Sequence, residues 1–366
     1  MRESGKRRKM SIFMKILCAL LSAVLVMVAI IGVFIWRKLD LISYGEMPSE
    51  PNPIVGAVED IPIQETLPVL SVNVEDIEII EMMPSVPDTE LNESEEIINF
   101  LLIGTDQRYG NTRYAARADS MIIVSFNKTL KTVKLVSLER GMGVPILDEE
   151  HEGQYDLLTH IYFWGGSELL QKTVEHCFKV DIDHYVHLDF NAVVRIVDEI
   201  GGIDVELSEA ETWYLGNHIY LNSSTGKQAP LRTGVNHLDG GNALAYARLR
   251  EIDSDWQRVG RQRKVILAVV EAVKHASLVE LNNLVNAVLP MINTNMTKLE
   301  IAELMLSAPD FLASEFDQMT IPKQGTYGGV QIRDGSYGFA IDYEINNDLL
   351  YRFLYEGVSA EELLTE

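Results

Sequence analysis

Apolar residues along positions 97–350 follow two different spacings, and each spacing predicts a different kind of element. Short runs of consecutive apolar residues predict buried strands, whereas apolar residues three or four positions apart predict helices. The two kinds alternate along the chain, which is typical of an α/β domain with a sheet between helices. The predicted strands are 97–103, 121–126, 133–137, 203–207 and 244–248, with a strand-and-turn segment at 316–342, and the predicted helices are 167–177, 190–200, 260–276, 281–289 and 298–307.

The segment 16–36 has a different pattern, because it contains 21 residues and no charge. As a helix that rises about 1.5 Å per residue it would span roughly 31 Å, the thickness of a bilayer's hydrocarbon core. Six Lys or Arg residues precede it, so the positive-inside rule keeps residues 1–15 in the cytoplasm and places the rest outside. A cleaved signal peptide is disfavoured, since no small-residue cleavage site follows. We therefore predict an uncleaved, single-pass signal anchor at the cell membrane.

Charge and proline content divide the remainder of the chain. Residues 39–96 contain 15 acidic residues, no Lys or Arg, and seven of the twelve prolines. This composition predicts an acidic, extended linker over 37–96, followed by one domain over 97–350 and an acidic tail over 351–366. The formal net charge is −23, which argues against a nucleic-acid partner for a domain outside the cell. Cys177 is the only cysteine after the predicted anchor, so no intramolecular disulfide is expected there.

The segment 243–264 concentrates positive charge in this acidic protein, with five arginines and one lysine. Guanidinium groups bind phosphate and pyrophosphate in bidentate geometry, so this density indicates an anionic ligand. Arg248 and Arg250 alternate as on one face of a strand. Arg258, Arg261 and Gln262 have the spacing of one helix face.

The alternative is that these arginines pair only with nearby acids. Glu251, Asp253 and Asp255 lie within the same segment. Three acids cannot neutralise six bases, so the alternative explains some of the arginines and not all of them.

Charged residues also flank the first three predicted strands. Asp106 and Arg108 follow the first strand, Arg117 and Asp119 precede the second, and Arg140 follows the third. Ligands of α/β domains tend to bind at the carboxyl ends of strands. Two carboxylates beside a phosphate-bearing ligand form a plausible Mg²⁺ site. Taken singly, each acid–base pair is more typical of a surface salt bridge.

The order of these motifs resembles the LytR-CpsA-Psr family of Gram-positive cell-envelope proteins. The resemblance covers about residues 97–275 and is carried by LLIGTDQR, ARADSMIIVS, VSLER, THIYFWGG, DHYVHLDFNAVVRIVDEIGGIDVEL and LDGGNALAYARLREIDSDWQRVGRQRKVI. It implies a three-layer α/β/α domain around a twisted central mixed sheet, with an apolar tunnel for a polyprenyl-pyrophosphate lipid. It also implies transfer of a glycopolymer, such as teichoic acid or capsule, from that lipid to peptidoglycan.

Carried over to this sequence, the resemblance implies Mg²⁺ at Asp106 and Asp119. It implies Arg140, Arg248 and Arg258 as catalytic residues. The full set implied to line the pyrophosphate is Arg108, Arg117, Arg140, Arg248, Arg250, Arg258 and Arg261, with Gln262 nearby. The acceptor of the hydroxyl proton stays open between Asp119, Asp106 and a substrate phosphate.

One motif departs from the family pattern. The family's S-x-P-R-D reads SLERG at 137–141, so that Glu139 replaces the proline and Gly141 replaces the aspartate. Gly141 favours a second interpretation, a non-catalytic lipid-glycan binder or regulator such as a transcriptional attenuator. A pyrophosphatase acting on the same lipid is a third. Retention of Asp106, Asp119 and the matching arginines favours the transferase.

Overall fold

The computed structural model describes residues 37–39, 42–44, 83–106, 117–332 and 337–365. The predicted cytoplasmic tail at 1–15 and signal anchor at 16–36 lie outside these ranges. Within the described ranges, no helix is long and apolar enough to cross a membrane.

A seven-stranded mixed sheet forms the centre of the domain, in the order β1-β10-β7-β2-β3-β4-β11. β2, β3 and β4 are consecutive antiparallel strands, whereas β7 adds in parallel to β2, and β11 in parallel to β4. The prediction of an α/β fold with a central sheet is therefore confirmed. The bounds are β1 (Ser43–Tyr44), β2 (Ile97–Thr105), β3 (Ala118–Asn127), β4 (Thr132–Leu138), β7 (His184–Asp189), β10 (Asn293–Thr294) and β11 (Glu315–Ile321).

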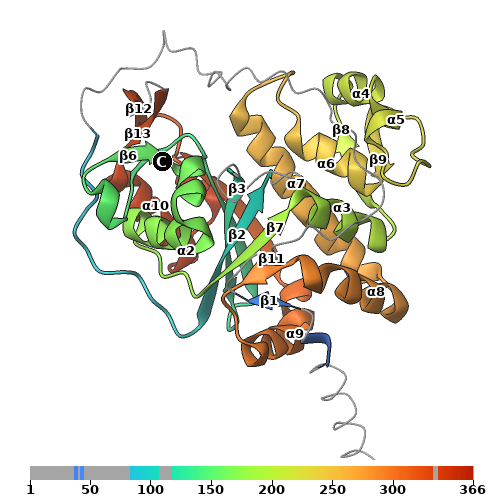
Figure 1. The fold of residues 1–366 in the computed structure, drawn as a ribbon, viewed down its shortest axis with the longest axis horizontal. Coiled ribbons are helices and arrows are strands. Elements are labelled where there is room, and N and C mark those ends of the chain that lie inside the picture. The colour runs from blue at the N-terminus through green and yellow to red at the C-terminus, as the bar shows by residue number, and fades with distance from the viewer. Residues whose placement is uncertain (1–36, 40–41, 45–82, 107–116, 333–336, 366) are drawn as a thin grey trace, which may run out of the picture.

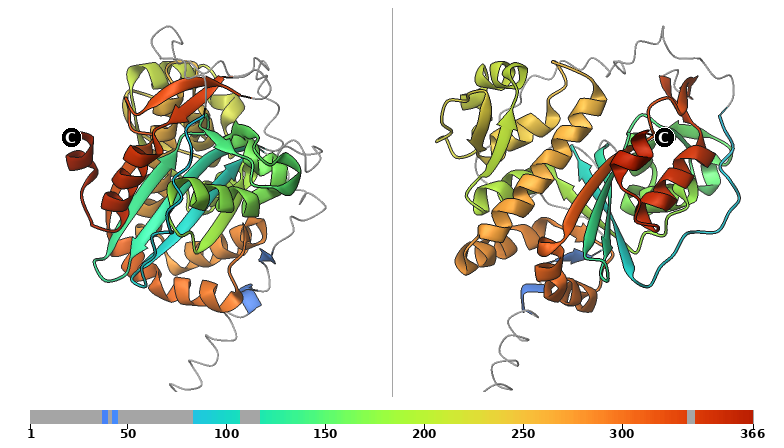
Figure 2. Two further views of the ribbon diagram at one scale, coloured as in Figure 1. Left: turned by 90° about the vertical axis from the view of Figure 1, so that its left-hand side faces the viewer. Right: turned by 180° about the vertical axis from the view of Figure 1, so that it is seen from behind.

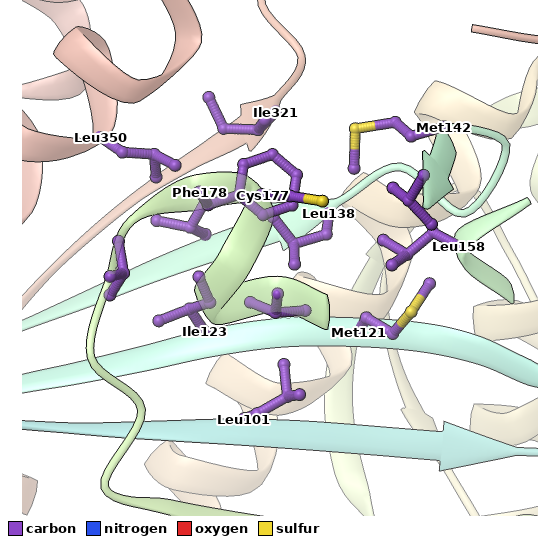
Figure 3. Packing of buried hydrophobic residues seen from close by; sticks show 14 of the residues in the cluster. Leu101, Met121, Ile123, Leu138, Met142, Leu158, Cys177, Phe178, Ile321 and Leu350 are labelled. Carbon is purple, nitrogen blue, oxygen red and sulfur yellow. The ribbon is translucent and has the colours of Figure 1, made fainter. Parts of the chain in front are cut away.

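Helices cover both faces of this sheet (Figures 1 and 2). The main core lies on the face covered by α2 and α10, where Leu101, Ile123 and Phe178 are fully buried (Figure 3). Helix α7 covers the other face, where Ile266 and Leu267 pack against β3 and β4. The helices are α2 (Leu158–Phe178), α3 (Phe190–Glu199), α4 (Glu209–Gly216), α5 (Ile219–Asn222), α6 (Gly240–Arg248), α7 (Asp255–His275), α8 (Leu278–Val288), α9 (Lys298–Ala313), α10 (Tyr343–Leu354) and α11 (Ala360–Thr365).

Among the residues that the structure describes, three two-stranded sheets lie outside the central sheet. They pair β5 (Gly143–Pro145) with β6 (Tyr155–Leu157), β8 (Ile203–Leu207) with β9 (Gly234–Leu238), and β12 (Tyr327–Gln331) with β13 (Tyr337–Ile341). The strand predicted at 203–207 is therefore present, although it belongs to a separate hairpin.

The prediction of a strand at 244–248 is wrong, because these residues form the second half of helix α6. The Asp239 side chain caps this helix by accepting from the backbone N–H of Asn242. The cap satisfies one of the backbone N–H groups that have no partner in the first turn of a helix. Gly240 and Gly241 allow the helix to approach its neighbours closely, since a Cβ at Gly241 would lie 1.7 Å from the backbone oxygen of Asn222. Alternating polar and apolar residues in a short segment do not distinguish such a helix from a strand.

The domain extends beyond both predicted boundaries, residues 97 and 350. At the amino-terminal side, Leu39 and Ile42 are buried against α9, and β1 pairs with β10, so part of the predicted linker belongs to the domain. At the carboxyl-terminal side, α10 continues to Leu354 and the buried Leu363 of α11 joins the main core. Apolar residues at these positions outweigh the acidic composition from which a linker and a tail were predicted.

Candidate active site

Six charged side chains from four separate segments meet at one end of the central sheet. Asp119 is the second residue of β3, Arg140 follows β4, and Asp255 and Arg258 lie in the first turn of α7. Arg248 ends α6, and Arg250 follows in the connection to α7. We call the set of Arg140, Arg248, Arg250 and Arg258, with Asp119 and Asp255, the arginine cluster.

Asp119 lies between three of these arginines. Its Oδ1 is 2.9 Å from Nη1 of Arg140, 3.4 Å from Nη2 of Arg250 and 3.9 Å from Nη1 of Arg258. Burial opposes ionisation of Asp119, but the positive charges of Arg140, Arg258, Arg250 and Arg248 outweigh it and hold its pKa below the usual value. Asp119 is therefore an ionised carboxylate and a weak proton acceptor.

Asp255 makes a second bridge between the same arginines. Its Oδ2 is 2.9 Å from both Nε of Arg140 and Nη2 of Arg258, and its Oδ1 is 3.6 Å from Nε of Arg250. The carboxylate also benefits from its place in the first turn of α7, near the positive end of the helix dipole. Sequence reasoning treated Asp255 only as a neutralising charge. Its spacing of three residues from Arg258, directly after Ser254, is the signal that could have identified it.

The cluster keeps positive charge in excess. Four guanidinium groups face two carboxylates, which leaves a formal charge of +2 when both acids are ionised. The side chains of Arg140 and Arg258 are only 9% and 2% exposed, whereas that of Arg250 is 34% exposed. Among its described neighbours, the buried Nε of Arg258 has no hydrogen-bond partner. Such an arrangement is suited to receive an anion.

Glu139 lies behind the cluster and was not predicted as a site residue. Its side chain is fully buried. Its Oε2 accepts the backbone N–H of Arg140 at 2.9 Å, while Oε1 has no hydrogen-bond partner among the described residues. Burial and the neighbouring charge of Asp255 outweigh the attraction of Arg258 and Arg140 and raise the pKa of Glu139 to about 7.

Arg261 does not join the arginine cluster, although the sequence placed it there. Its guanidinium forms a bidentate pair with Asp253 at 2.6 and 2.7 Å and donates to the backbone oxygen of Leu249 at 2.5 Å. A further contact of 3.4 Å reaches Glu211 of α4. Arg261 therefore fixes the connection that carries Arg250 to both α7 and α4, and acts as a positioning residue.

The remaining predicted residues lie around this centre. Asp106 directly follows β2 and is half-buried, and its Oδ1 accepts the backbone N–H of the exposed Arg117 at 3.1 Å. Gln262 is half-buried on α7. The guanidinium of Arg248 lies 4.5 Å from the ring centre of Phe190. Arg108 lies outside the described residues.

The predicted Mg²⁺ site can be tested against these contacts. In the described part of the chain, no three His, Cys, Asp or Glu residues converge on one point. Asp119 is ionised, and each of its ion pairs with described residues uses Oδ1, so these arginines leave Oδ2 available. Mg²⁺ accepts one or two carboxylates together with phosphate oxygens. The residues therefore fit an ion that binds together with a phosphate ligand, whose charge would offset the surrounding arginines.

An apolar surface extends from the cluster along the face of the sheet that α7 covers. Leu102, Val124, Val186 and Leu188 point to this face from β2, β3 and β7 and are all half-buried. The same strands bury their opposite face completely at Leu101, Ile103 and Ile123. Fully buried side chains such as Ile122 and Phe126 lie on this same face, so it combines half-buried and fully buried apolar residues.

The profile of the LytR_cpsA_psr family matches residues 72–352. The chain belongs to this family. Among curated relatives, it is 33% identical over 190 residues to the polyisoprenyl-teichoic acid–peptidoglycan teichoic acid transferase TagT of Bacillus subtilis, covering 51% of this chain and 56% of TagT. It is 29% identical over 233 residues to the transferase TagU of Bacillus anthracis, covering 63% of this chain and 70% of TagU. The match thus spans little more than half of TagT.

Solved structures of the family share this fold. TagT bound to LI-WTA matches with a TM-score of 0.57 and 25% identity, over 74% of this chain and 95% of that chain. TagT with bound octaprenyl pyrophosphate matches with a TM-score of 0.52 and 25% identity, over the same shares of the two chains. The central mixed sheet between helices is therefore the family's fold.

Proposed function

We propose that this protein is a membrane-anchored phosphotransferase that moves a glycopolymer from a polyprenyl-pyrophosphate carrier to peptidoglycan outside the cell. The observation that carries the proposal is the arginine cluster, where four guanidinium groups converge at one end of an apolar sheet face. A lipid pyrophosphate has the matching chemistry, with two charged phosphates and a long apolar chain. The names of the relatives TagT and TagU support teichoic acid as the first polymer to test.

The transfer requires one bond to form and one to break. A sugar hydroxyl of peptidoglycan attacks the phosphorus that bears the glycan, and the bond from that phosphorus to the bridging oxygen breaks. Polyprenyl phosphate leaves with the electron pair, and Arg140, Arg248 and Arg258 offset the charge that develops on it. The hydroxyl proton passes to Asp106 or to a phosphate oxygen, because the low pKa of Asp119 makes it a weak base.

Mg²⁺ belongs to this proposal as a cofactor held through Asp106 and Asp119 together with the phosphates. When bound, it would supply further neutralisation of phosphate charge. Asp119 then has two tasks, since it also orients Arg140 and Arg250 toward the ligand through Oδ1.

The test uses the full-length protein in detergent with Mg²⁺ and a polyprenyl-pyrophosphate-linked oligosaccharide, with and without a peptidoglycan oligomer. Mass spectrometry measures free polyprenyl phosphate and a phosphodiester-linked adduct. Arg250→Ala is the informative variant, because its side chain is partly exposed and its ion pairs are long. Loss of a charge-assisted hydrogen bond of about 1.5–3 kcal/mol predicts roughly a 10- to 150-fold loss of carrier affinity.

Arg195→Ala is the matched control. Arg195 is 42% exposed on α3 and pairs with Glu199 on the same helix, so its removal should leave affinity and transfer unchanged. Equal affinity of the wild type and Arg250→Ala would refute the assigned site. Release of polyprenyl phosphate without an adduct would support the pyrophosphatase, and tight binding without turnover would support the binder or regulator.

A further inference from the structure

The point at which the chain enters the domain is fixed in place. Residues 37–39 are helical, and Leu39 is fully buried against Met296 and Ile301. The side chain of Lys38 donates to Asn286 of α8. β1 then pairs with β10, with Ser43 opposite Asn293. The residue next to the uncharged run 16–36 is thus held against helices α8 and α9, and not at the end of a free spacer.

Helix α9 carries apolar side chains on two sides. Ile301 and Leu304 face inward and pack with Leu39. Leu299 and Leu306 are seven positions apart, which places them on one face of the helix, and they are 65% and 76% exposed. Exposed apolar side chains that gather on one surface are typical of a site that contacts a partner or a membrane.

Helix α8 contributes to the same end of the molecule. Its first two residues, Leu278 and Val279, are 85% and 69% exposed. Both helices lie beside residues 37–39 in all three views (Figures 1 and 2). We call this region, formed by α8, α9 and residues 37–39, the α8–α9 end.

We propose that the α8–α9 end rests on the surface of the lipid bilayer, with Leu299 and Leu306 in its interfacial layer. The inference rests on the anchor of the proposed function, because a helix at 16–36 that crosses the bilayer would leave it directly at residue 37. The occupant is a bilayer and not a protein, since the chain itself connects this end to the membrane. The exposed acids Glu303 and Asp310 lie on the same face of α9 as Leu299 and Leu306, so anionic lipid is not expected to strengthen the docking.

This orientation places the arginine cluster at the far end of the sheet. α9 packs at the near end, where Phe311 contacts Phe126 and Asp310 pairs with Lys131 in the turn after β3. Asp119 precedes Asn127 by eight positions on β3, which corresponds to about 26 Å along the strand at about 3.3 Å per residue. A carrier with its pyrophosphate in the cluster would then extend its tail along the apolar face toward the bilayer.

The test places an environment-sensitive fluorophore on the full-length protein in vesicles of phosphatidylcholine, with and without phosphatidylglycerol. A single cysteine is introduced as Leu306→Cys in a Cys18→Ala background and labelled with NBD. Leu221→Cys on α5 is the matched control, because Leu221 is 71% exposed and α5 lies at the opposite end of the molecule (Figure 1). Quenching by nitroxide-labelled lipid and by aqueous iodide is measured for each probe.

The expected result is a blue shift and strong lipid quenching for the probe at 306, with iodide protection, and the reverse for the probe at 221. The pattern should be the same with and without phosphatidylglycerol. Similar iodide quenching at both sites, in protein that floats with the vesicles, would overturn the docking but leave the anchor intact. Protein that does not float with vesicles would overturn the anchor and the docking together. Neither readout requires transfer activity, so a failed transferase assay is a separate result.

Discussion

Glu139 gives the sharpest quantitative prediction, because a single buried carboxyl lies behind a functional cluster of arginines. The replacement Glu139→Gln keeps the shape of the side chain and leaves an oxygen that can accept the backbone N–H of Arg140. It removes only the ability to ionise. The change therefore isolates the cost of charging this position.

The magnitude follows from the pKa of Glu139, which rises from 4.5 to about 7 on folding. Each pKa unit corresponds to about 1.4 kcal/mol, so ionisation of Glu139 costs the folded state about 3 kcal/mol. The folded state holds this proton more tightly than the unfolded state, so the contribution of Glu139 to the free energy of unfolding falls as the pH rises from 4.5 to 7. Below this window both states are protonated, and the cost is absent.

The assay is thermal unfolding of wild type and Glu139→Gln between pH 4 and pH 8. The variant should gain about 3 kcal/mol relative to wild type across this range, which corresponds to a relative gain of about 6–12 °C in melting temperature. Glu206→Gln, at an exposed position on β8, controls for the loss of one acidic charge. A separation between Glu139→Gln and wild type that stays constant with pH would refute the reasoning.

Three further outcomes follow from other buried contacts of the structure. Arg261→Ala should lower the free energy of unfolding by about 3–5 kcal/mol, because it leaves Asp253 and Glu211 without their buried partner; urea unfolding measures this, and a loss below 1 kcal/mol would contradict it. Asp119→Asn should weaken the Mg²⁺ dependence of transfer, which a metal titration of adduct formation measures, and an unchanged metal requirement would exclude Asp119 as a ligand. Cys177 should resist maleimide at pH 7 until the protein is unfolded, because burial raises the pKa of its thiol to about 12; fast labelling of the folded Cys18→Ala protein would contradict this.

The central strands could be predicted from the sequence because apolar residues fill most successive positions. Both faces of each strand are then apolar, as in a strand buried on both sides. The runs 97–103, 121–126 and 133–137 all lie within observed strands. The segment 244–248 was predicted incorrectly, because its sequence LAYAR alternates as a strand does but contains two alanines, which favour a helix. Its helix is specified instead by the Asp239 cap and by glycines that lie close to other helices. The close approach at the glycines depends on the tertiary structure, so the local sequence does not reveal it.

The sequence likewise predicted some features of the site residues, whereas others depend on the tertiary structure. Arg258 and Arg261 share a spacing that predicts one helix face, yet three residues advance about 4.5 Å along a helix. This offset along the helix axis lets the two arginines meet different acids. Arg258 pairs with Asp255, and Arg261 pairs with Asp253. Which carboxylate each arginine meets depends on the path of the connection after α6. The protonation of Glu139 depends on burial by β11, β12 and α7, which no local pattern records.

The order of strands also has a consequence for how the chain folds. β2, β3 and β4 are neighbours in sequence and in the sheet, so they can pair as soon as they are made. Both outer pairings join distant positions, since Ser43 meets Asn293 and Thr132 meets Glu315. Pairings between distant positions carry a larger loop-closure cost and form late.

The first strand of the domain to be synthesised is therefore among the last to find its partner. β1 must wait until α8 and β10 have been made. A fragment cut at 97 or at 350, the boundaries that composition favours, would keep the early meander. It would lose β1 and Leu39 at one end, or Phe353 and Leu363 at the other, and would expose a sheet edge or an apolar face that invites aggregation.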